Sequence, residues 1–168
     1  DASTTEETYM EVIRGKTAML FEASTHSAAA LAEATPEQRE ALRTFGDHLG
    51  VAFQLVDDLL DYRGDAQTLG KNVGDDLAEG KPTLPLIYTM REGTPEQAAL
   101  VRTAIQKGGI EDLESIRAAV EASGSLEYTA QLARDYVARA IVCLDALPPS
   151  QYRDALVELS EFAVARTH

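Results

Sequence analysis

Apolar residues recur with the three- and four-residue spacing of amphipathic helices along nearly the whole chain. No run alternates between apolar and polar side chains in the way that a half-buried strand does. The pattern predicts an all-α fold, in a single helical domain that spans residues 1–168. The predicted helices begin near Thr5, at Thr35 and after Pro82, and then cover residues 95–107, 110–122, 126–147 and 151–166. The apolar residues of the last helices that are predicted to form core are Ile116, Val120, Leu132, Tyr136, Ile141, Leu144, Leu156, Leu159 and Phe162.

Two copies of the tetrapeptide Thr-Pro-Glu-Gln, at 35–38 and 94–97, carry a helix start signal. Threonine caps the helix, proline occupies the first helical position, and glutamine three residues after the cap completes a capping box. The sequences that follow the two copies differ, so they mark two helix starts and not an internal repeat.

The helix after the first copy carries three closely spaced carboxylates near its end, Asp57, Asp58 and Asp61, and is predicted to end at about Tyr62 or Arg63. At about 100° per residue, Asp61 lies roughly 40° from Asp57 and roughly 60° from Asp58 around the axis. The three side chains therefore share one face, and they repel each other unless a cation is present. Carboxylates without His or Cys suit Mg²⁺ or Mn²⁺ better than zinc. The alternative is a solvated acidic helix end.

Four further residues fall near this acidic face, namely Phe53, Gln54, Gly46 and Gly50. Apolar residues fill the rest of the circumference, which predicts a buried helix with an acidic patch toward a cavity. Phe53 either contacts a ligand or packs in the core. The glycines either leave room for a substrate or let another helix pack closely.

A long glycine-rich segment, residues 64–82, follows the acidic face. Loops of this length are usually functional or disordered, and the apolar residues within this one favour an ordered loop. Lys71 and Lys81 each follow a glycine, a combination that lets backbone and a point charge approach a phosphate. The acidic residues between the two lysines are interpreted as organising the loop rather than binding metal.

Lys16 and Thr17 interrupt an otherwise apolar stretch of the first helix. A lysine among apolar residues is costly to bury unless an anion lies beside it. Two interpretations stay open: Lys16 faces a bound anion, or its side chain extends to the surface.

Charge and composition exclude several classes of protein. A net charge of −13 argues against nucleic acid as the main partner. The single cysteine, Cys143, cannot form an internal disulfide and is compatible with a cytoplasmic location, which we predict. Neither Cys143 nor any of the histidines has the spacing of a metal site or a catalytic triad. No apolar run approaches the roughly 20 residues of a membrane span, and no signal peptide is visible.

Two blocks, FQLVDDLLD at 53–61 and GKNVGDDLAEGKPTLPL at 70–86, resemble the second aspartate-rich region of trans-polyprenyl diphosphate synthases. IRGKTAMLFEAS at 13–24 resembles the Lys-Thr helix of that family, and FAVAR at 162–166 resembles its last helix. The resemblance covers residues 9–166. The segment KPTLPL resembles the octaprenyl, solanesyl and decaprenyl members, which make quinone side chains, more than it resembles the short-chain farnesyl type.

The resemblance implies an antiparallel helical bundle of the isoprenoid synthase type around a deep cavity. It implies a Mg²⁺-dependent, head-to-tail (1′-4) condensation of isopentenyl diphosphate with an allylic prenyl diphosphate. Family members are commonly homodimers. We also expect a peripheral contact with the membrane when the long apolar product is released.

The resemblance also assigns roles, with Asp57 as the direct Mg²⁺ ligand. Lysines would stabilise the charge that develops on the leaving diphosphate, and Phe53 would face the cationic intermediate. The implied catalytic set is Lys16, Thr17, Gln54, Asp57, Asp58 and Lys71; the substrate-binding set is Lys16, Phe53, Gln54, Lys71 and Lys81; and the metal set is Asp57, Asp58 and Asp61.

A complete synthase of this family carries an additional DDxxD motif on an earlier helix, whereas this sequence has one, at 57–61. We therefore expect the chain to be the C-terminal half of a synthase and to be inactive, or nearly so, when alone. Three alternatives remain: a non-catalytic subunit of a heteromeric prenyl synthase, a short-chain farnesyl or geranylgeranyl diphosphate synthase, and a structural module whose acidic face merely binds cations. A class I terpene cyclase is near in fold but usually carries a different metal motif here.

Overall fold

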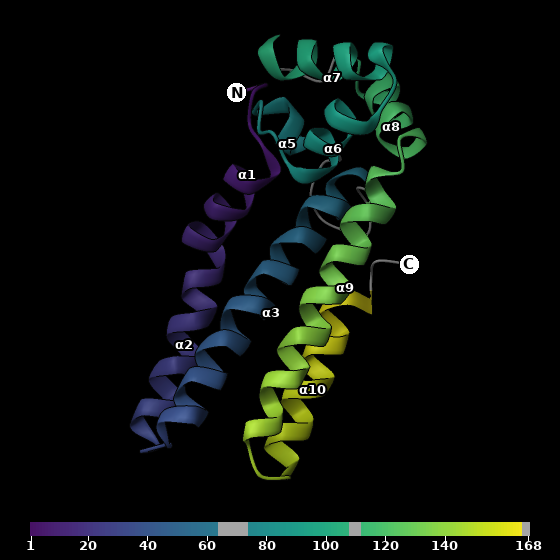
Figure 1. The fold of residues 1–168 in the computed structure, drawn as a ribbon. Helices are drawn as coiled ribbons and strands as arrows, with labels where there is room; N and C mark the ends of the chain where they lie inside the picture. The colour runs from purple at the N-terminus through teal and green to yellow at the C-terminus, as the bar shows by residue number, and fades with distance from the viewer. Residues whose placement is uncertain (64–73, 108–111, 166–168) are drawn as a thin grey trace. The chain divides into compact units, whose positions relative to one another are not determined.

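A computed structural model describes residues 1–63, 74–107 and 112–165 of the chain. Within these three segments the regular secondary structure is helical and no strand is present, which confirms the predicted all-α fold (Figure 1). None of the helices described there is both long enough and apolar enough to cross a membrane.

The first predicted helix is a continuous helical run that changes type in its middle. It consists of α1 (Glu6–Ile13), the π-helical segment η1 (Arg14–Ala18) and α2 (Met19–Leu31). A π-helical turn spaces its hydrogen bonds by five residues instead of four, and such turns are frequent at functional sites. Lys16 and Thr17, the two polar residues that the sequence singles out, both lie inside η1.

The longest helix is α3 (Pro36–Arg63), and it begins and ends where the sequence predicts. At its start the Gln38 N–H donates to the Thr35 hydroxyl over 3.2 Å, and the Thr35 N–H donates to the Gln38 side-chain oxygen over 3.1 Å. The same reciprocal pair joins Thr94 and Gln97. Both predicted capping boxes are therefore confirmed.

The predicted loop before Pro82 contains a short helix, α5 (Asp75–Ala78), that the sequence did not indicate. Next comes α6 (Leu84–Glu92), with a proline in its first turn as expected. The helix predicted over residues 126–147 is shorter than expected, because it ends at Cys143 and a 3₁₀ turn, η2 (Leu144–Ala146), follows it. The remaining helices are α7 (Pro95–Lys107), α8 (Leu113–Ala122), α9 (Ser125–Cys143) and α10 (Gln151–Val164).

The chain divides into two compact units, and each of them is discontinuous in sequence. Unit 1 comprises Asp1–Tyr9 and Asp57–Ala130, and unit 2 comprises Met10–Val56 and Gln131–His168. Because α3 crosses from one unit to the next between residues 56 and 57, its acidic turns belong to unit 1. The single helical domain over residues 1–168 stays a prediction.

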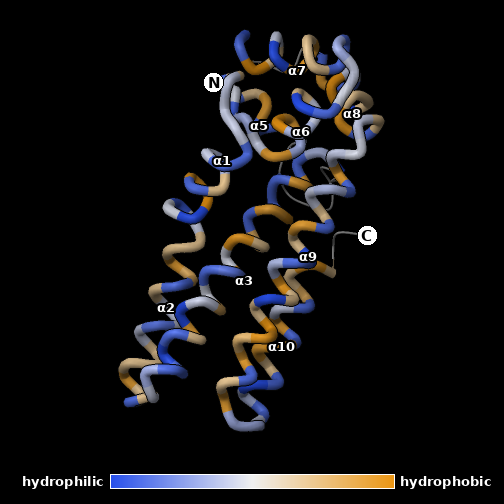
Figure 2. The backbone as a smooth tube through the Cα atoms, viewed as in Figure 1, coloured by the Kyte–Doolittle hydropathy of each residue, from blue (hydrophilic) through white to orange (hydrophobic). Residues whose placement is uncertain are grey.

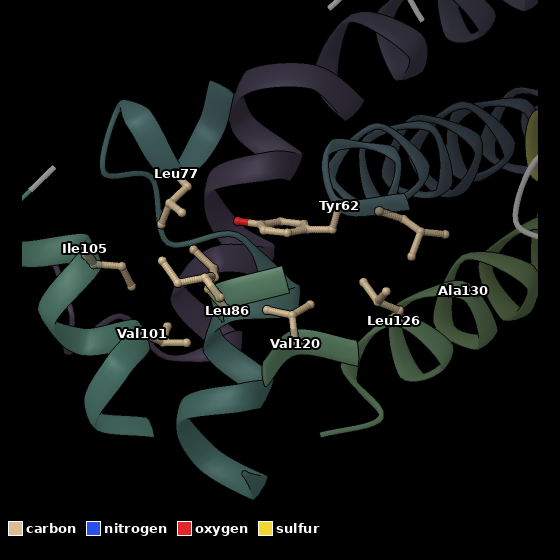
Figure 3. Packing of buried hydrophobic residues seen from close by; sticks show 10 residues of the cluster. Tyr62, Leu77, Leu86, Val101, Ile105, Val120, Leu126 and Ala130 are labelled. Carbon is tan, nitrogen blue, oxygen red and sulfur yellow. The ribbon is translucent and has the colours of Figure 1, made fainter. Parts of the chain in front are cut away.

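Unit 1 has an apolar core built from the end of α3 and from the helices that follow it. Leu59 and Tyr62 on α3 pack with side chains of α5, α6, α7 and α8 (Figure 3). This packing fixes the last turns of α3, which carry the three carboxylates. The buried members of the cluster are Leu59, Tyr62, Leu77, Leu86, Val101, Ile105, Ile116, Val120, Leu126 and Ala130.

Unit 2 has a separate core in which α2 lies beside the first part of α3, and α9 lies beside α10 (Figure 1). Figure 2 shows hydrophobic and hydrophilic stretches alternating along these helices, as expected for amphipathic elements. The buried centre is Phe45, Leu49, Ala140 and Leu144, and Phe21, Leu42, Cys143, Leu147, Leu156, Val157 and Ala163 pack against it.

Two of the predicted core positions are wrong. Leu159 and Phe162 on α10 are 52% and 68% exposed. The helix carries apolar residues on two faces, and the face with Leu156 and Val157 is the one that packs against the unit 2 core. Periodicity alone does not say which of two apolar faces a helix buries. Of the other predicted positions, Ile116, Val120, Tyr136 and Leu144 are buried, and Leu132, Ile141 and Leu156 are half-buried.

Candidate functional site

Asp57, Asp58 and Asp61 lie in the last two turns of α3 and differ in their access to solvent. Asp58 is 2% exposed and Asp61 is 8% exposed, whereas Asp57 is half-buried. On the face that the sequence predicts, one carboxylate is therefore accessible to solvent and two are largely buried. Buried carboxylates need hydrogen-bond donors, and unit 1 supplies them.

The donor to Asp58 comes from α1. The buried hydroxyl of Tyr9 donates to the Asp58 carboxylate oxygen Oδ2 in a short hydrogen bond. Burial, followed by the negative charge of Asp58, raises the pKa of Tyr9 well above its ordinary value, so the phenol keeps its proton. The sequence reasoning missed Tyr9. The sequence feature that could have indicated Tyr9 is a tyrosine hydroxyl on the apolar side of the first predicted helix, seven residues before Lys16.

Replacing Tyr9 by phenylalanine will destabilise the chain, because the buried Asp58 carboxylate loses a donor. Hydrogen bonds to charged groups contribute about 1.5–3 kcal/mol, and 1 kcal/mol corresponds to about 2–4 °C in Tm for a chain of this size. Thermal unfolding followed by circular dichroism measures the change. Tyr152→Phe on α10 is the matched control, since Tyr152 is 75% exposed and its loss of a hydroxyl is expected to be nearly neutral. Equal Tm values for the two variants would contradict the role of Tyr9.

Asp61 contacts the short helix α5. The backbone N–H of Asp76 donates to the Asp61 Oδ2 over 3.3 Å, and the N–H of Gly74 donates to the Asp61 carbonyl oxygen over 3.1 Å. Burial, and after it the Asp76 carboxylate, raises the pKa of Asp61 to about 6, while the Asp76 N–H opposes that rise. Asp61 is thus the member of the acidic face most closely tied to the chain that follows it.

Lys81 is exposed at the end of the α5 segment and lies among carboxylates. Its Nζ is 2.5 Å from the Glu79 carboxylate and 3.5 Å from that of Asp76. The hydrogen bond to Glu79 is the main cause that raises the pKa of Lys81, so the side chain is a cation at neutral pH. Asp76 and Glu79 therefore pair with Lys81, and the interpretation that the acidic residues organise the whole loop stays a prediction. Lys71, the other lysine of the predicted set, lies outside the described residues.

The η1 segment and α3 meet within unit 2 through Thr17 and Gln54. The Thr17 hydroxyl donates to the Gln54 side-chain oxygen over 2.8 Å. This hydrogen bond fixes the orientation of the Gln54 amide group, because its oxygen is the acceptor. Lys16, next to Thr17 on η1, has an exposed side chain. The structure thus brings together two of the predicted catalytic residues directly.

Phe53 is 47% exposed, so ordinary core packing does not account for it. Its ring lies beside the ring of Phe21 on α2, with 5.5 Å between the centroids and a tilt of 39°. The Phe53 side chain is therefore in contact with Phe21 and still about half exposed. That arrangement suits contact with an apolar or cationic ligand.

Gly46 and Gly50 serve close helix packing, which decides between the two interpretations that the sequence left open. A Cβ at Gly50 would come within 2.6 Å of the Ala18 Cα, and one at Gly46 within 2.6 Å of the Phe21 carbonyl oxygen. Both neighbours are backbone atoms of the first helical run. The glycines hold η1 and α2 against α3 and so support the Thr17–Gln54 contact.

The donor groups on α3 are carboxylate oxygens, and these fit a hard cation such as Mg²⁺, which commonly takes one or two carboxylates together with phosphate oxygens and water. Over residues 1–63, 74–107 and 112–165, no three His, Cys, Asp or Glu side chains converge closely enough to form a metal site among themselves.

Comparison with known proteins identifies relatives of this chain. Residues 1–123 match the polyprenyl synthetase family. The chain is 53% identical to the octaprenyl diphosphate synthase of Escherichia coli K12, over 99% of its own length and 52% of the relative's. It is 52% identical to the all-trans-nonaprenyl-diphosphate synthase (geranyl-diphosphate specific) of Rhodobacter capsulatus, over 97% of its own length and 50% of the relative's.

Solved structures give the same result. The polyprenyl synthase of Caulobacter crescentus CB15, crystallised with calcium and isoprenyl diphosphate, superposes with a TM-score of 0.93 at 41% identity. That comparison covers 100% of this chain and 52% of the other. The chain thus spans about half the length of the relatives that it matches. The family match over most of the chain, together with these identities, shows that the chain belongs to the polyprenyl synthetase family.

Proposed function

We propose that this chain is the C-terminal half of a trans-polyprenyl diphosphate synthase, a prenyltransferase. The reaction joins isopentenyl diphosphate to an allylic prenyl diphosphate in a head-to-tail (1′-4) condensation. The observation that carries the proposal is the last part of α3, where Gln54, held by Thr17, precedes the acidic turn with Asp57 and Asp58. The acidic turn suits a diphosphate head that is held through a cation, and the exposed Phe53 side chain suits an apolar tail.

The product is a long-chain polyprenyl diphosphate, a precursor of a quinone side chain. Identity supports this choice over a short chain. The octaprenyl relative is 53% identical, whereas a short chain isoprenyl diphosphate synthase of Methanothermobacter thermautotrophicus and the geranylgeranyl diphosphate synthase of Saccharolobus solfataricus are each 35% identical. The same proposal includes a cytoplasmic location, a homodimer and peripheral membrane contact on product release.

Asp57 and Asp58 hold Mg²⁺, with Asp57, the more exposed of the two, as the direct ligand. When bound, Mg²⁺ neutralises the negative charge that develops on the diphosphate as it leaves. Tyr9 keeps the Asp58 carboxylate in one orientation by its hydrogen bond. Mn²⁺ has the same preference for oxygen ligands and can substitute in experiments.

Three lysines, Lys16, Lys71 and Lys81, bind the diphosphate. They supply positive charge to its oxygens, and such charge stabilises the leaving group more than the bound ester. Gln54, oriented by Thr17, lines the position of the reacting carbons. Phe53 presents its open ring face to the allylic cation, which the negative face of an aromatic ring stabilises.

Isothermal titration of the chain tests the proposal. Inorganic pyrophosphate is expected to bind in the presence of Mg²⁺ and to lose most of its affinity when EDTA removes the metal. In a radiolabelled condensation assay, the same chain is expected to give no product alone, because one DDxxD motif supplies only half of the metal ligands of the family site. Metal-independent binding, or no binding at all, would contradict the diphosphate site. Turnover by the chain alone would contradict its assignment as a half.

A further inference from the structure

The start of α5 has no cap of its own. The first N–H groups of any helix lack partners within the helix and need an acceptor from elsewhere. The residue before α5 is Gly74, which has a positive φ of 88° and no side chain that could accept a hydrogen bond. A neighbouring segment or water must therefore supply the acceptors for α5.

Asp61 supplies acceptors through both its side chain and its backbone. Its Oδ2 accepts the N–H of Asp76, and its carbonyl oxygen accepts the N–H of Gly74, over 3.3 Å and 3.1 Å. Asp61 is 8% exposed, so these hydrogen bonds are largely shielded from water. The packing of Leu77 into the unit 1 core holds α5 from its other side.

The connection continues from α5 to Lys81. The Lys81 N–H donates to the Asp76 carbonyl oxygen over 2.9 Å, and the Lys81 Nζ lies 3.5 Å from the Asp76 carboxylate. Gly80, with a positive φ of 67°, makes the turn between them. Asp76 therefore contacts Asp61 with its N–H and Lys81 with its carbonyl and carboxylate groups.

We propose that Asp61 is a positioning residue, whose carboxylate anchors α5 and through Asp76 fixes Lys81, and that it does not ligate the metal. The consequence for diphosphate binding rests on the proposed function, whereas the anchor itself does not. The acidic face of α3 is then divided between two tasks. Asp57 serves the metal directly, Asp58 is held in place by Tyr9, and Asp61 serves the lysine segment.

Asparagine and alanine substitutions separate the two tasks. Asp61→Asn removes the negative charge but keeps a side-chain oxygen that accepts the Asp76 N–H, whereas Asp61→Ala removes both. Asp57→Asn is the matched change at the proposed metal ligand. Two measurements apply to each variant: hydrogen–deuterium exchange of residues 74–81, and the affinity for Mn²⁺ with inorganic pyrophosphate by electron paramagnetic resonance.

If Asp61 is a positioning residue, Asp61→Asn keeps the exchange protection of residues 74–81, and its affinity for Mn²⁺ stays within about threefold of that of the parent chain. Asp61→Ala loses about tenfold in protection, the effect of one buried hydrogen bond to a charged acceptor. Asp57→Asn keeps the exchange protection of residues 74–81 and loses the affinity for Mn²⁺. If Asp61 ligated the metal, the loss of its charge in Asp61→Asn would lower the affinity for Mn²⁺ as much as Asp57→Asn does. That result would overturn the proposal.

Unchanged protection of residues 74–81 in Asp61→Ala would also overturn it, since the anchor would then contribute nothing. If the parent chain itself does not bind Mn²⁺ with pyrophosphate, the proposed function fails. The exchange measurement still decides whether Asp61 anchors α5, because that measurement needs no ligand. Asp61→Asn keeps this comparison available even if Asp61→Ala does not fold.

Discussion

Replacing Asp57 by asparagine will lower the affinity of the chain for Mg²⁺ with inorganic pyrophosphate by at least about 100-fold. Among Asp57, Asp58 and Asp61, Asp57 has the best access to solvent, and the other two are buried. Asparagine has the same shape but carries no charge, so the metal loses its direct ligand while α3 keeps its packing. Isothermal titration with Mg²⁺ in excess measures the change.

Asp154→Asn on α10 is the control for this measurement. It removes the same unit of charge from an exposed position, where salt screens the long-range effect, and we expect a change of less than about twofold. If the affinity of Asp57→Asn stayed within threefold of that of the parent chain, Asp57 would not be a ligand of the metal. Circular dichroism of both variants should be superimposable with that of the parent.

The second large effect is expected at Gly50. Alanine there would place its Cβ 2.6 Å from the Ala18 Cα, a backbone atom that cannot move aside by a change of rotamer. Overpacking costs about 1–3 kcal/mol and sometimes more, and the better helix propensity of alanine offsets no more than about 1 kcal/mol of it. We expect a net loss of about 2 kcal/mol, which lowers Tm by roughly 4–8 °C. Gly46→Ala should behave similarly, since its Cβ would lie 2.6 Å from the Phe21 carbonyl oxygen.

Gly15→Ala is the matched control in the same region of the chain. No atom lies within 4 Å of a Cβ built at Gly15, so the added methyl group meets open space. This variant should be as stable as the parent chain or slightly more stable, because alanine loses less conformational entropy on folding. If Gly50→Ala and Gly15→Ala unfolded at the same temperature, close packing between η1 and α3 would not be what Gly50 provides.

Much of the helical framework followed from local sequence signals. The capping boxes at Thr35 and Thr94 located two helix starts to the residue, because both partners of each hydrogen bond lie within four consecutive positions. The end of α3 at Arg63 was also predicted within one residue. The sequence predicted that Thr17 and Gln54 belong to the same site, but the direct hydrogen bond between them is seen only in the structure.

Other features depend on tertiary contacts that leave no mark in a local pattern. Helix α5 is four residues long and is capped by Asp61, which lies more than a dozen positions earlier. The three carboxylates looked equivalent around the axis of α3, but Tyr9 and Asp76 give two of them different partners. Leu159 and Phe162 have helical spacing and are nonetheless exposed, because the other apolar face of α10 packs against the core.

The η1 segment makes the first helical run unequally tolerant of insertions and deletions. Its turn contains one residue more than an α-helical turn, so the loss of one residue from Arg14–Ala18 can convert it to an α-helical turn and leave the later side chains of α2 in place. A residue lost between Met19 and Thr25 would instead rotate the two ends of the run by about 100° relative to each other. Thr17 could then not donate to Gln54 while Thr25 donates to the Leu42 carbonyl oxygen. A residue lost after Thr25 would disturb neither contact. Length variation in this run should therefore be confined to η1 and to the C-terminal end.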